Sequence, residues 1–332
     1  MSDRLRFGII GCGAIALESH FPAVVKSRKA QLAAALDLDP TWARATAKRF
    51  GAIFAGTRYQ DLPGRIDAAI VATPNSSHAE ISRYLLENGV HVLCEKPMAT
   101  TAGEARSMLA AERSGTARLM IGQSLRFTPQ MQFLRKILAG GFMAREGTLS
   151  ISLGNVYGSW RPRTDFRLKP ELSGGGVMMD LGAHLIDLAL WLFEDRPEDV
   201  EYSQSISPGW SVEDDAEVKL TFSRGGRALL AASYRQEMNG LLEYSGSDGW
   251  VKTGVQGGDL DFYLGRSRGC RAAGVQQPVL DSTDPYIAQL EHFCTLLRSG
   301  GPFLVQTDQV ILGLEIIKAC YARNGRFSMD ET

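Results

Sequence analysis

A lysine at the end of an apolar run is the first residue of this chain whose position suggests chemistry. Lys96 lies in Glu95-Lys96-Pro97, directly after the apolar run 90–94. Open parallel sheets bind ligands beyond the carboxyl ends of their strands, so an ammonium group here would reach a ligand. Pro97 disfavours helical backbone at Lys96 and favours an extended exit from the strand. The alternative is a solvated lysine before a proline that starts a helix.

A carboxylate and an imidazole form the second candidate pair. Segment 174–187 begins with three glycines, and Asp180 and His184 follow four residues apart. On the helix expected there, this spacing brings both side chains to one face, a natural way to present an imidazole beside a carboxylate. The nearby sequence offers no further ligands for a metal, so we expect none. A buried structural histidine is the alternative.

The turn between the first strand and the first helix has the G-x-G-x-x-A spacing of a dinucleotide-binding fingerprint. The first glycine permits the tight turn, the second lets a pyrophosphate approach the backbone, and the alanine keeps helix and strand close. The alternative is a glycine-rich turn that binds no cofactor. The candidate cofactor-binding residues here are Gly11, Cys12, Gly13, Ala14, Ile15 and Ala16.

Asp37 supplies the acid that this fingerprint requires. It stands 21 residues beyond Ala16 (37 minus 16), at the end of the second expected strand. A carboxylate there accepts hydrogen bonds from an adenosine ribose and repels a 2′-phosphate. Because Leu38 rather than an arginine follows, the sequence favours NAD over NADP as the cofactor.

The elements that must position these residues alternate in the first part of the chain. Short apolar runs and amphipathic stretches follow one another up to about residue 122, which is typical of parallel strands joined by helices. The expected strands are 5–10, 31–36, 68–72, 91–94 and 119–121. The expected helices are 14–26, 42–50, 79–88 and 102–114, the last opening with a capping box from Thr101 to Glu104.

The rhythm changes after a helix expected at 129–138. A strand at 148–153, a long loop and one helix lead to the alternating runs 216–222, 228–234, 241–244 and 259–264, and two helices at 285–297 and 309–321 end the chain. This pattern predicts an antiparallel or mixed sheet with helices on one face. We therefore expect two domains, a dinucleotide-binding domain at 1–122 and a substrate-binding and oligomerisation domain at 123–332.

The composition of the chain limits the classes of molecule that it is expected to bind. The chain has 332 residues and a formal net charge of -1, so it lacks the positive field that would hold nucleic acid or anionic lipid. The five cysteines are widely spaced without a C-x-x-C pair, which argues against a disulfide framework or a structural zinc and favours the reducing cytosol. No apolar run approaches the length of a membrane helix. A small-molecule partner in the cytoplasm is expected.

Taken together, the fingerprint, Glu95-Lys96-Pro97 and the glycine-rich segment with Asp180 and His184 resemble the Gfo/Idh/MocA family of oxidoreductases over essentially the whole chain. Further matches are 73–78, Arg126-Phe127, Trp160-Arg161 and Asp284-Pro285-Tyr286. The resemblance implies an α/β fold: an N-terminal Rossmann domain with a doubly wound parallel sheet, then an α/β domain with a large, mostly antiparallel sheet. That sheet often joins subunits in the family, so a homodimer or homotetramer is expected.

The resemblance also implies roles for residues. Lys96, Asp180 and His184 would form the catalytic group. Besides the fingerprint and Asp37, the residues lining the cofactor would be Thr73, Asn75, His78, Glu95 and Lys96. Substrate contacts are assigned to Arg126, Trp160, Arg161 and Tyr286. A basic loop with Arg163, Arg167 and Lys169 could bind an anionic sugar or simply face water.

The expected function is hydride transfer between a nicotinamide and a secondary alcohol or ketone of a sugar, amino sugar, nucleotide sugar or cyclitol. His184 would exchange the hydroxyl proton, Lys96 would stabilise the developing alkoxide, and Asp180 would orient them. Two alternatives stay open: a glycoside hydrolase that uses bound NAD transiently, and a non-catalytic NAD-sensing regulator. The intact Lys96, Asp180 and His184 count against the regulator.

Overall fold

The computed structural model describes residues 4–159, 163–266, 273–323 and 325–329. Packing divides the chain into two compact units. The first comprises residues 1–124, 160–174 and 284–311, and the second comprises 125–159, 175–283 and 312–332. The expected nucleotide-binding domain, 1–122, lies within the first unit, which also recruits two later segments. The functional division at residue 122 stays a prediction.

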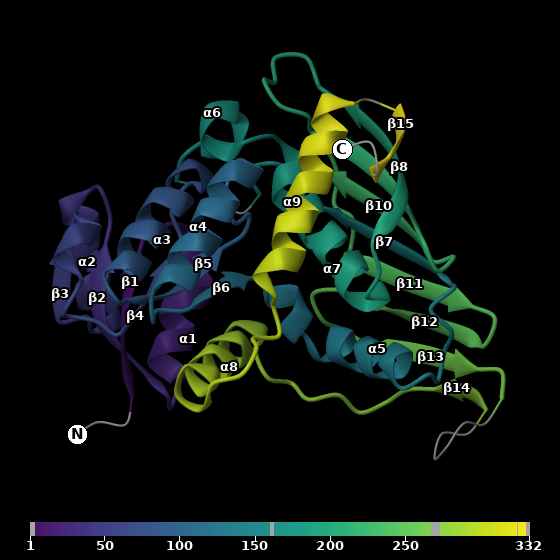
Figure 1. Ribbon diagram of the computed structural model, residues 1–332, viewed down its shortest axis with the longest axis horizontal. Coiled ribbons are helices and arrows are strands. Elements are labelled where there is room, and N and C mark those ends of the chain that lie inside the picture. Colours follow the sequence, from purple (N-terminus) through teal and green to yellow (C-terminus); the bar gives the residue numbers. More distant parts are fainter. Residues whose placement is uncertain (1–3, 160–162, 267–272, 324, 330–332) are drawn as a thin grey trace. The chain divides into compact units, whose positions relative to one another are not determined.

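A six-stranded parallel sheet forms the centre of the first unit, with the strand order β3-β2-β1-β4-β5-β6 (Figure 1). Its strands are β1 (Leu5–Ile10), β2 (Ala30–Leu36), β3 (Phe54–Gly56), β4 (Ala68–Val71), β5 (His91–Glu95) and β6 (Leu119–Gly122). This is the predicted doubly wound sheet, and β4 and β6 are buried at every position, as expected when helices cover both faces. The order reverses between β1 and β4, so the crevice that binds ligands in such sheets lies beyond their carboxyl ends.

Local signals explain where the helices of this unit begin and end. The helices are α1 (Phe21–Lys26), α2 (Pro40–Phe50), α3 (His78–Glu87), α4 (Ala102–Ser114), α6 (Pro170–Ser173) and α8 (Pro285–Ser299). Asp39 caps α2 by accepting hydrogen bonds from two backbone N–H groups, and Gly51 ends it with φ 79°. The predicted capping box of α4 is confirmed, because Thr101 and Glu104 each accept the other's backbone N–H.

The first helix differs from the continuous helix expected at 14–26. After two α-helical residues, Ala14 and Ile15, the backbone widens into a π-helical turn, η1 (Ala16–His20), and α1 follows. Pro22 gives the physical reason: it has no N–H to donate to the carbonyl four residues earlier, so the α-helical ladder is interrupted there. A later helix covers the same unit, since Phe293 of α8 packs on Phe7 of β1 with ring centroids 6.4 Å apart.

The second unit contains a nine-stranded, mostly antiparallel sheet, as expected, with the order β14-β13-β12-β11-β7-β10-β9-β8-β15. The strands are β7 (Thr148–Gly154), β8 (Pro197–Ser205), β9 (Asp215–Phe222), β10 (Arg227–Ser233), β11 (Leu241–Gly246), β12 (Gly249–Gly254), β13 (Leu260–Leu264), β14 (Gly274–Gln276) and β15 (Gly325–Ser328). Only β7 and β10 pair in parallel among these strands. Burial alternates along β9 and β10, so one face of the sheet is covered and the other is exposed.

Helices cover the buried face of this sheet. They are α5 (Pro129–Ala139), the π-helical turn η6 (Met178–Gly182), α7 (Ala183–Phe193) and most of α9 (Thr307–Ala322). Phe133 of α5 packs on Phe262 of β13, and Phe193 of α7 packs on Phe222 of β9. Every residue of α7 except His184 is buried. The helix is therefore a core element that brings one partly exposed imidazole to its start.

Five strands were not expected from the sequence: β3, β8, β12, β14 and β15. Two of them, β3 and β14, have only three residues each. Strand β8 begins with a proline and carries polar residues on its exposed positions, which hides its apolar alternation. Short or half-polar strands such as these depend on pairing with neighbours for their stability rather than on their own composition.

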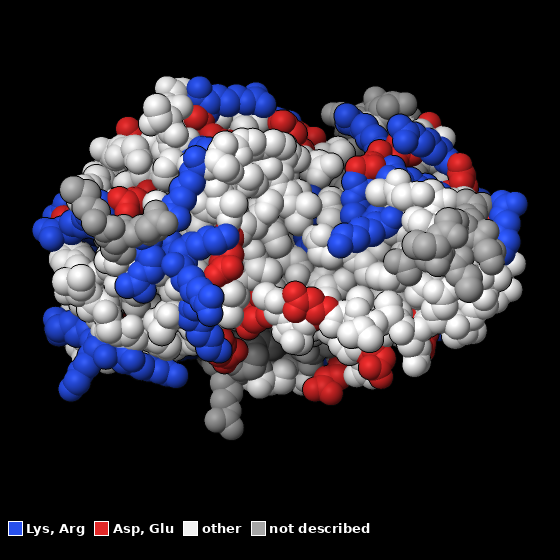
Figure 2. All heavy atoms as spheres, turned by 90° about the horizontal axis from the view of Figure 1, so that it is seen from below, with Lys and Arg blue, Asp and Glu red and all other residues white. Residues whose placement is uncertain are grey.

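Two surface properties bear on partners. On the face shown in Figure 2, Lys and Arg side chains are interspersed with Asp and Glu side chains and with uncharged residues. One stretch of the described chain, Pro170–Phe193, is long and apolar enough to cross a membrane by length and composition. Because 78% of its most apolar window is buried inside the protein, its apolar side chains belong to the core.

Candidate active site

The fingerprint turn lies where β1 ends. Gly11 has φ +94°, and a Cβ atom there would come within 2.4 Å of the Ala72 carbonyl oxygen at the end of β4. A Cβ atom on Gly13 would meet nothing within 4 Å, so no packing within the described chain requires glycine at that position. Ala16 is fully buried. The fold itself explains Gly11 and Ala16, whereas Gly13 faces open space that a bound pyrophosphate would use.

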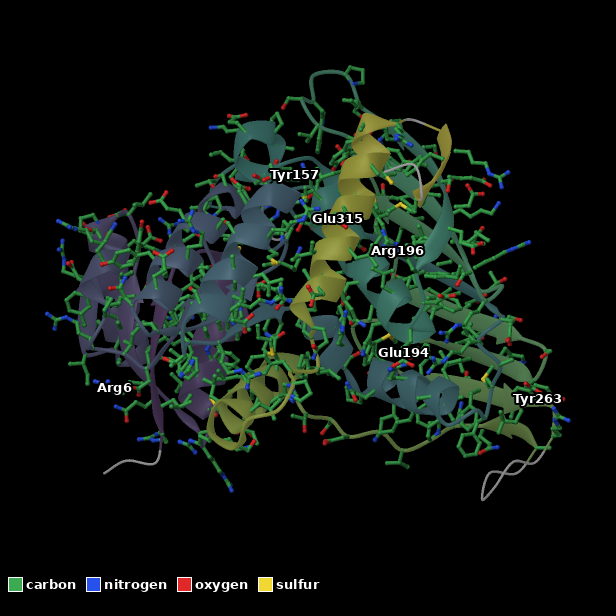
Figure 3. The ribbon with its side chains drawn as sticks, in the orientation of Figure 1. Arg6, Tyr157, Glu194, Arg196, Tyr263 and Glu315 are labelled. Carbon is green, nitrogen blue, oxygen red and sulfur yellow. The ribbon has the colours of Figure 1, made fainter. Side chains whose placement is uncertain are left out.

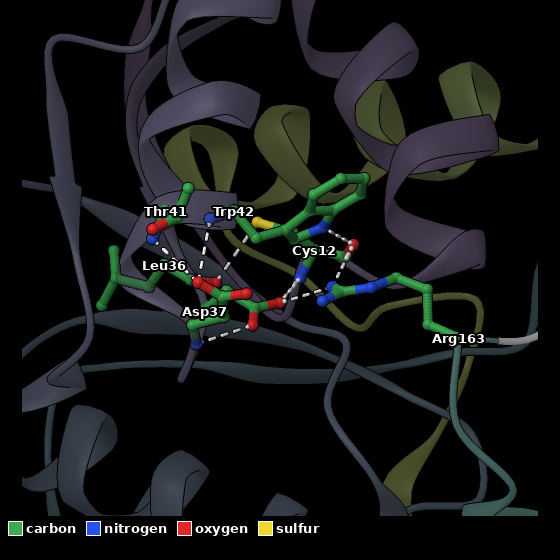
Figure 4. Close-up of polar contacts among 7 residues, drawn as sticks. Cys12, Leu36, Asp37, Thr41, Trp42 and Arg163 are labelled. Carbon is green, nitrogen blue, oxygen red and sulfur yellow. Dashed lines mark hydrogen bonds and ion pairs between the residues drawn. The ribbon is translucent and has the colours of Figure 1, made fainter.

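Asp37 follows β2 and contacts the same turn (Figure 4). Its Oδ2 atom accepts hydrogen bonds from the Cys12 backbone N–H at 3.0 Å and from Arg163 at 3.2 Å, and its Oδ1 atom accepts one from the Asp39 N–H at 3.1 Å. The carboxylate is thereby fixed beside the fingerprint. Leu38, the next residue, is 92% exposed, so its side chain is not part of the protein core.

Cys12 holds the fingerprint turn in place through its backbone groups rather than through its thiol. The side chain is fully buried and burial raises the pKa of the thiol to about 11, so it is protonated and unreactive at neutral pH. The Cys12 carbonyl accepts a hydrogen bond from the indole N–H of Trp42 at 2.8 Å. Ala14 and Ile15 are half-buried in the first helical turn after the glycines.

Lys96 leaves the carboxyl end of β5 and is half-buried. Its peptide bond to Pro97 is cis. The neighbouring Glu95 is buried and accepts a hydrogen bond from the Lys96 backbone N–H at 3.2 Å, while its other oxygen lies 2.7 Å from His20 Nε2. The ring of Tyr286 packs edge-on against His20 at 5.3 Å. The buried Glu95 carboxylate therefore fixes the backbone of Lys96. His20 contacts this carboxylate, and Tyr286 packs against His20.

The segment after β4 is tied down by buried hydrogen bonds. His78 is buried, and its two ring nitrogens each lie 2.9 Å from a carbonyl oxygen, one of Thr73 and one of Pro97. Burial lowers the pKa of His78, although both carbonyls oppose that shift. Asn75 donates to the Ser173 carbonyl at 2.8 Å. These residues join the loops that follow β4 and β5; their contact with a cofactor stays a prediction.

Asp180 and His184, the other two residues of the expected catalytic group, lie in the second unit. Asp180 is in the π-helical turn η6 and His184 is in the first turn of α7, so they do not share one regular α-helix as expected. Asp180 accepts a hydrogen bond from the Tyr234 hydroxyl at 2.7 Å. Tyr234 packs against Tyr157 and Trp210, and Tyr157 is labelled in Figure 3. π-Helical turns are frequent at functional sites, which fits this placement.

Glu213 anchors the glycine-rich segment that leads into η6. This buried carboxylate accepts hydrogen bonds from the backbone N–H groups of Gly176 and Met178 and, at 2.6 Å, from the Tyr321 hydroxyl. A Cβ atom on Gly175 would lie 2.2 Å from the Tyr321 hydroxyl, and one on Gly176 would lie 2.1 Å from the Glu213 carbonyl oxygen. Both glycines are therefore required by these contacts.

The remaining substrate candidates have different outcomes. Arg126 is fully buried and donates to both oxygens of Asp187 at 2.7 Å, beneath the ring of Trp191. This buried ion pair gives Arg126 a structural role, and its contact with a substrate stays a prediction. Trp160 and Arg161 lie outside the described residues. Among the described residues, no three His, Cys, Asp or Glu side chains group as metal ligands would.

Sequence reasoning missed three of these partners. Tyr234 and Glu213 had no local signal, and Arg163 appeared only as one charge in a basic loop. The three glycines at 174–176 were the available hint, because glycine runs mark close approaches by backbone or side chains. The structure identifies the approaching groups as Glu213 and Tyr321.

A doubly wound sheet with a dinucleotide fingerprint and an acid after β2 defines the class of nucleotide-binding Rossmann proteins. The particular family follows from comparison with known proteins. Residues 5–123 match the family described as "Oxidoreductase family, NAD-binding Rossmann fold", and residues 131–252 match the "GFO/IDH/MocA C-terminal domain". The chain belongs to the Gfo/Idh/MocA family of oxidoreductases, as the sequence motifs predicted.

Several characterised proteins are similar over nearly the whole chain. The D-apiose dehydrogenase of Paraburkholderia graminis is 26% identical and covers 97% of this chain and 89% of that protein. A protein of Haloferax volcanii named D-xylose 1-dehydrogenase (NADP(+)) 2 is 25% identical, with 96% of each chain covered. The aldose-aldose oxidoreductase of Caulobacter crescentus, solved with glycerol, superimposes with a TM-score of 0.88 at 25% identity over 98% of this chain and 100% of that one.

Proposed function

We propose that this protein is an NAD-dependent oxidoreductase that acts on a secondary alcohol or ketone of a sugar, amino sugar, nucleotide sugar or cyclitol. The observation that carries the proposal is the pairing of an open Gly13 with a fixed Asp37 at the ends of β1 and β2. The first leaves room for a pyrophosphate, and the second offers a carboxylate to a ribose hydroxyl. When bound, the nicotinamide supplies the acceptor or donor for a hydride.

Lys96 is proposed to stabilise charge on the substrate oxygen. It lies at the carboxyl end of β5, the edge of the sheet where ligands bind in this fold. An ammonium group there donates a hydrogen bond that strengthens as the hydroxyl becomes an alkoxide. Glu95 holds the backbone of Lys96, and His20 holds Glu95, so the lysine is supported by a chain of buried contacts.

His184 is proposed to take the hydroxyl proton during oxidation and to return it during reduction. Imidazole exchanges protons near neutral pH, and His184 is the one residue of α7 that is not fully buried. Asp180 is proposed to orient this group, and Tyr234 in turn fixes Asp180 through its hydroxyl. An imidazole oriented by a carboxylate is typical of acid–base catalysis.

Several features support the setting and substrate. The four described cysteines, Cys12, Cys94, Cys294 and Cys320, are free and buried, which supports the reducing cytoplasm. The names of similar proteins, D-apiose dehydrogenase and D-xylose dehydrogenase, support a carbohydrate substrate. A panel of sugars, cyclitols and their phosphorylated or nucleotide-linked forms, screened with NAD and NADH by cofactor fluorescence, identifies which substrate is used.

The roles of Lys96 and His184 are tested by separating chemistry from cofactor binding. Lys96→Ala and His184→Ala are each expected to lower kcat by about 10²- to 10⁴-fold, because each removes a group that acts on the substrate hydroxyl. NAD affinity, measured by fluorescence titration, is expected to survive, since neither residue belongs to the fingerprint. Lys26→Ala, which removes an exposed lysine at the end of α1, serves as the matched control.

The double variant tests whether both groups act in one step. Residues that act as a unit are strongly non-additive, so Lys96→Ala with His184→Ala should cost little more than the worse single variant. Near-normal turnover in either single variant would contradict the assignment. Cleavage of a chromogenic glycoside without net NADH formation would contradict the proposed reaction and favour the hydrolase alternative.

A further inference from the structure

Arg163 reaches the cofactor edge from a distant part of the sequence. It lies 126 residues beyond Asp37, yet both belong to the first unit, and its Nη1 atom donates to Asp37 Oδ2 at 3.2 Å and to the Cys12 carbonyl at 3.3 Å (Figure 4). Both acceptors belong to the surface proposed to bind the adenosine ribose. The basic loop noted in the sequence thus delivers one specific guanidinium to that surface.

The guanidinium is held in place before any ligand arrives. It stacks over the ring of Trp42 with 4.3 Å from Cζ to the ring centroid, and the indole N–H of Trp42 is itself bonded to the Cys12 carbonyl. A stacked guanidinium has its plane and direction fixed, which reduces the entropy lost when it binds an anion. Among the described residues, its Nε and Nη2 donors have no hydrogen-bond partner.

The contact with Arg163 also changes what Asp37 offers. An isolated carboxylate at this position repels a 2′-phosphate and so favours NAD. Here the carboxylate is paired with a cation, and its oxygens already accept from Cys12 and Asp39. The Arg163 side chain is 37% exposed, and exposed ion pairs contribute little to folding, so the pair is open to exchange with a ligand.

We infer that Arg163 is a specificity-determining residue for the cofactor's 2′ position, which lets the site accept a 2′-phosphate despite Asp37. The inference rests on the proposed binding of a nicotinamide dinucleotide and concerns its adenosine end alone. Asp37 serves the 2′-hydroxyl of NAD, and the unused donors of Arg163 serve the phosphate of NADP, which a guanidinium binds with two parallel hydrogen bonds. The difference in affinity between NAD and NADP is therefore small, because Arg163 offers donors to the 2′-phosphate of NADP.

Binding titrations test this without turnover. Isothermal titration of NADH, NADPH, 5′-AMP and 2′,5′-ADP is carried out on the full chain and on Arg163→Ala and Arg163→Lys. Arg163→Ala is expected to weaken NADPH and 2′,5′-ADP by about 10- to 100-fold and to change NADH and 5′-AMP by less than about 3-fold. Arg163→Lys should fall between, because lysine keeps the charge but loses the paired donors.

Two controls make the outcome decisive. Arg83→Ala removes an exposed arginine of α3 that forms an ion pair with Glu87, so it makes the same charge change without touching the proposed ribose surface. Asp37→Ala should weaken NADH more than NADPH. Equal loss of both cofactors in Arg163→Ala, no loss of either, or a gain in NADH with NADPH unchanged would overturn the inference. Failure of the unaltered protein to bind either dinucleotide would instead overturn the proposed function.

Discussion

Gly11 and Gly13 are glycines for different physical reasons. Gly11 has a backbone conformation that side chains rarely adopt, and a Cβ atom would collide with the Ala72 carbonyl at 2.4 Å. Gly13 has neither constraint, because a Cβ atom there meets nothing within 4 Å. The fold requires the first glycine, whereas no contact within the described chain requires the second.

This difference predicts the behaviour of Gly13→Ala. The free energy of unfolding should change by no more than about 0.5 kcal/mol, because the methyl group enters open space and the backbone conformation suits alanine. Cofactor affinity should fall by about 10-fold or more, since the pyrophosphate must approach the backbone where the methyl group would stand. Thermal unfolding and fluorescence titration measure the two effects.

Gly103→Ala is the matched control for this substitution. Gly103 lies in α4, and the nearest atom to its Cβ would be Thr101 Oγ1 at 4.0 Å. Alanine should be neutral or stabilising there and should leave cofactor binding unchanged. A Gly13→Ala protein that binds NADH normally would show that the turn does not carry the pyrophosphate.

At the scale of elements, the π-helical turn η6 depends on one buried acid. Glu213 satisfies backbone N–H groups at the start of this turn, which no earlier residue of the helix could do. It also fixes Tyr321 of α9 by a hydrogen bond. Because Asp180 lies within η6, the acid that anchors the turn also determines where the candidate catalytic carboxylate stands.

Glu213→Ala is expected to destabilise the protein by about 3 kcal/mol, because it leaves two buried N–H groups and a buried hydroxyl without their acceptor. Turnover should also fall at temperatures where the variant remains folded, since Asp180 loses its fixed position. Chemical denaturation and steady-state kinetics measure these effects. Glu217→Ala, on an exposed position of β9, should change neither, and an unaltered denaturation midpoint for Glu213→Ala would contradict the anchoring role.

Most elements could be predicted from the sequence because their signals are local. Strands buried on both faces, such as β4, appear in the sequence as continuous apolar runs. The start of α4 is marked by the capping box that Thr101 and Glu104 form. The interruption of the first helix at Pro22 was not foreseen, although the proline was visible. Strand β8 was missed because its outward positions are polar and its stability comes from pairing with β9 and β15.

The candidate residues of the site could be named from the sequence, whereas the contacts that support them could not. Lys96, Asp37 and His184 follow from position and residue type. Their partners lie far away in sequence: Arg163 is 126 residues from Asp37, and Tyr234 is 54 residues from Asp180. No local pattern encodes such a contact, because it arises only when the sheet brings separate loops together.

At the scale of the whole molecule, the exposed face of the nine-stranded sheet carries apolar side chains. Its outward positions include apolar side chains that are partly exposed: Leu229, Leu241, Trp250, Tyr263 and Val275, of which Tyr263 is labelled in Figure 3. The pairing of β12 with β13 places Trp250 opposite Tyr263, and their rings stack. Apolar sheet faces of this kind mark interfaces, so we propose that two or four copies assemble through it.

Light scattering after size exclusion tests this assembly. The unaltered protein is expected to be a dimer or tetramer, and Leu229→Asp with Tyr263→Asp is expected to shift it toward monomer, because each places a charge in an apolar interface. Ile53→Asp alters an apolar residue that is 85% exposed in the first unit and should leave the assembly intact. A monomeric unaltered protein at micromolar concentration would contradict the proposal.

Besides the buried His78, two partly buried histidines make the stability of the first unit depend on pH. His91 and His292 each accept a backbone N–H on a ring nitrogen, from Arg118 and Leu304 respectively, which only the neutral imidazole can do. Burial lowers the pKa of both, and Arg118 lowers that of His91 further. The unfolded chain therefore binds more protons than the folded one below a pH of about 6.5.

Stability should consequently be complete above that pH and fall as the pH is lowered from 7 to 5.5. The unfolding temperature, followed by circular dichroism in buffers of constant ionic strength, measures the slope. His91→Asn with His292→Asn should lower the unfolding temperature at pH 7 and flatten its dependence on pH. An equally steep slope in that double variant would assign the effect to other groups.

The position of α8 has a consequence for how the chain is made. Phe293 covers Phe7 of the first strand, and Arg118 donates to the carbonyls of Leu296 and Gly301, so the first unit is completed by a helix that begins 163 residues after β6 ends (285 minus 122). When all six parallel strands have been synthesised, helix α8, which covers part of their sheet, has not yet been made. The nascent chain therefore carries an open apolar surface on the finished sheet while residues 123–284 are made, an interval in which unfinished chains are prone to aggregate.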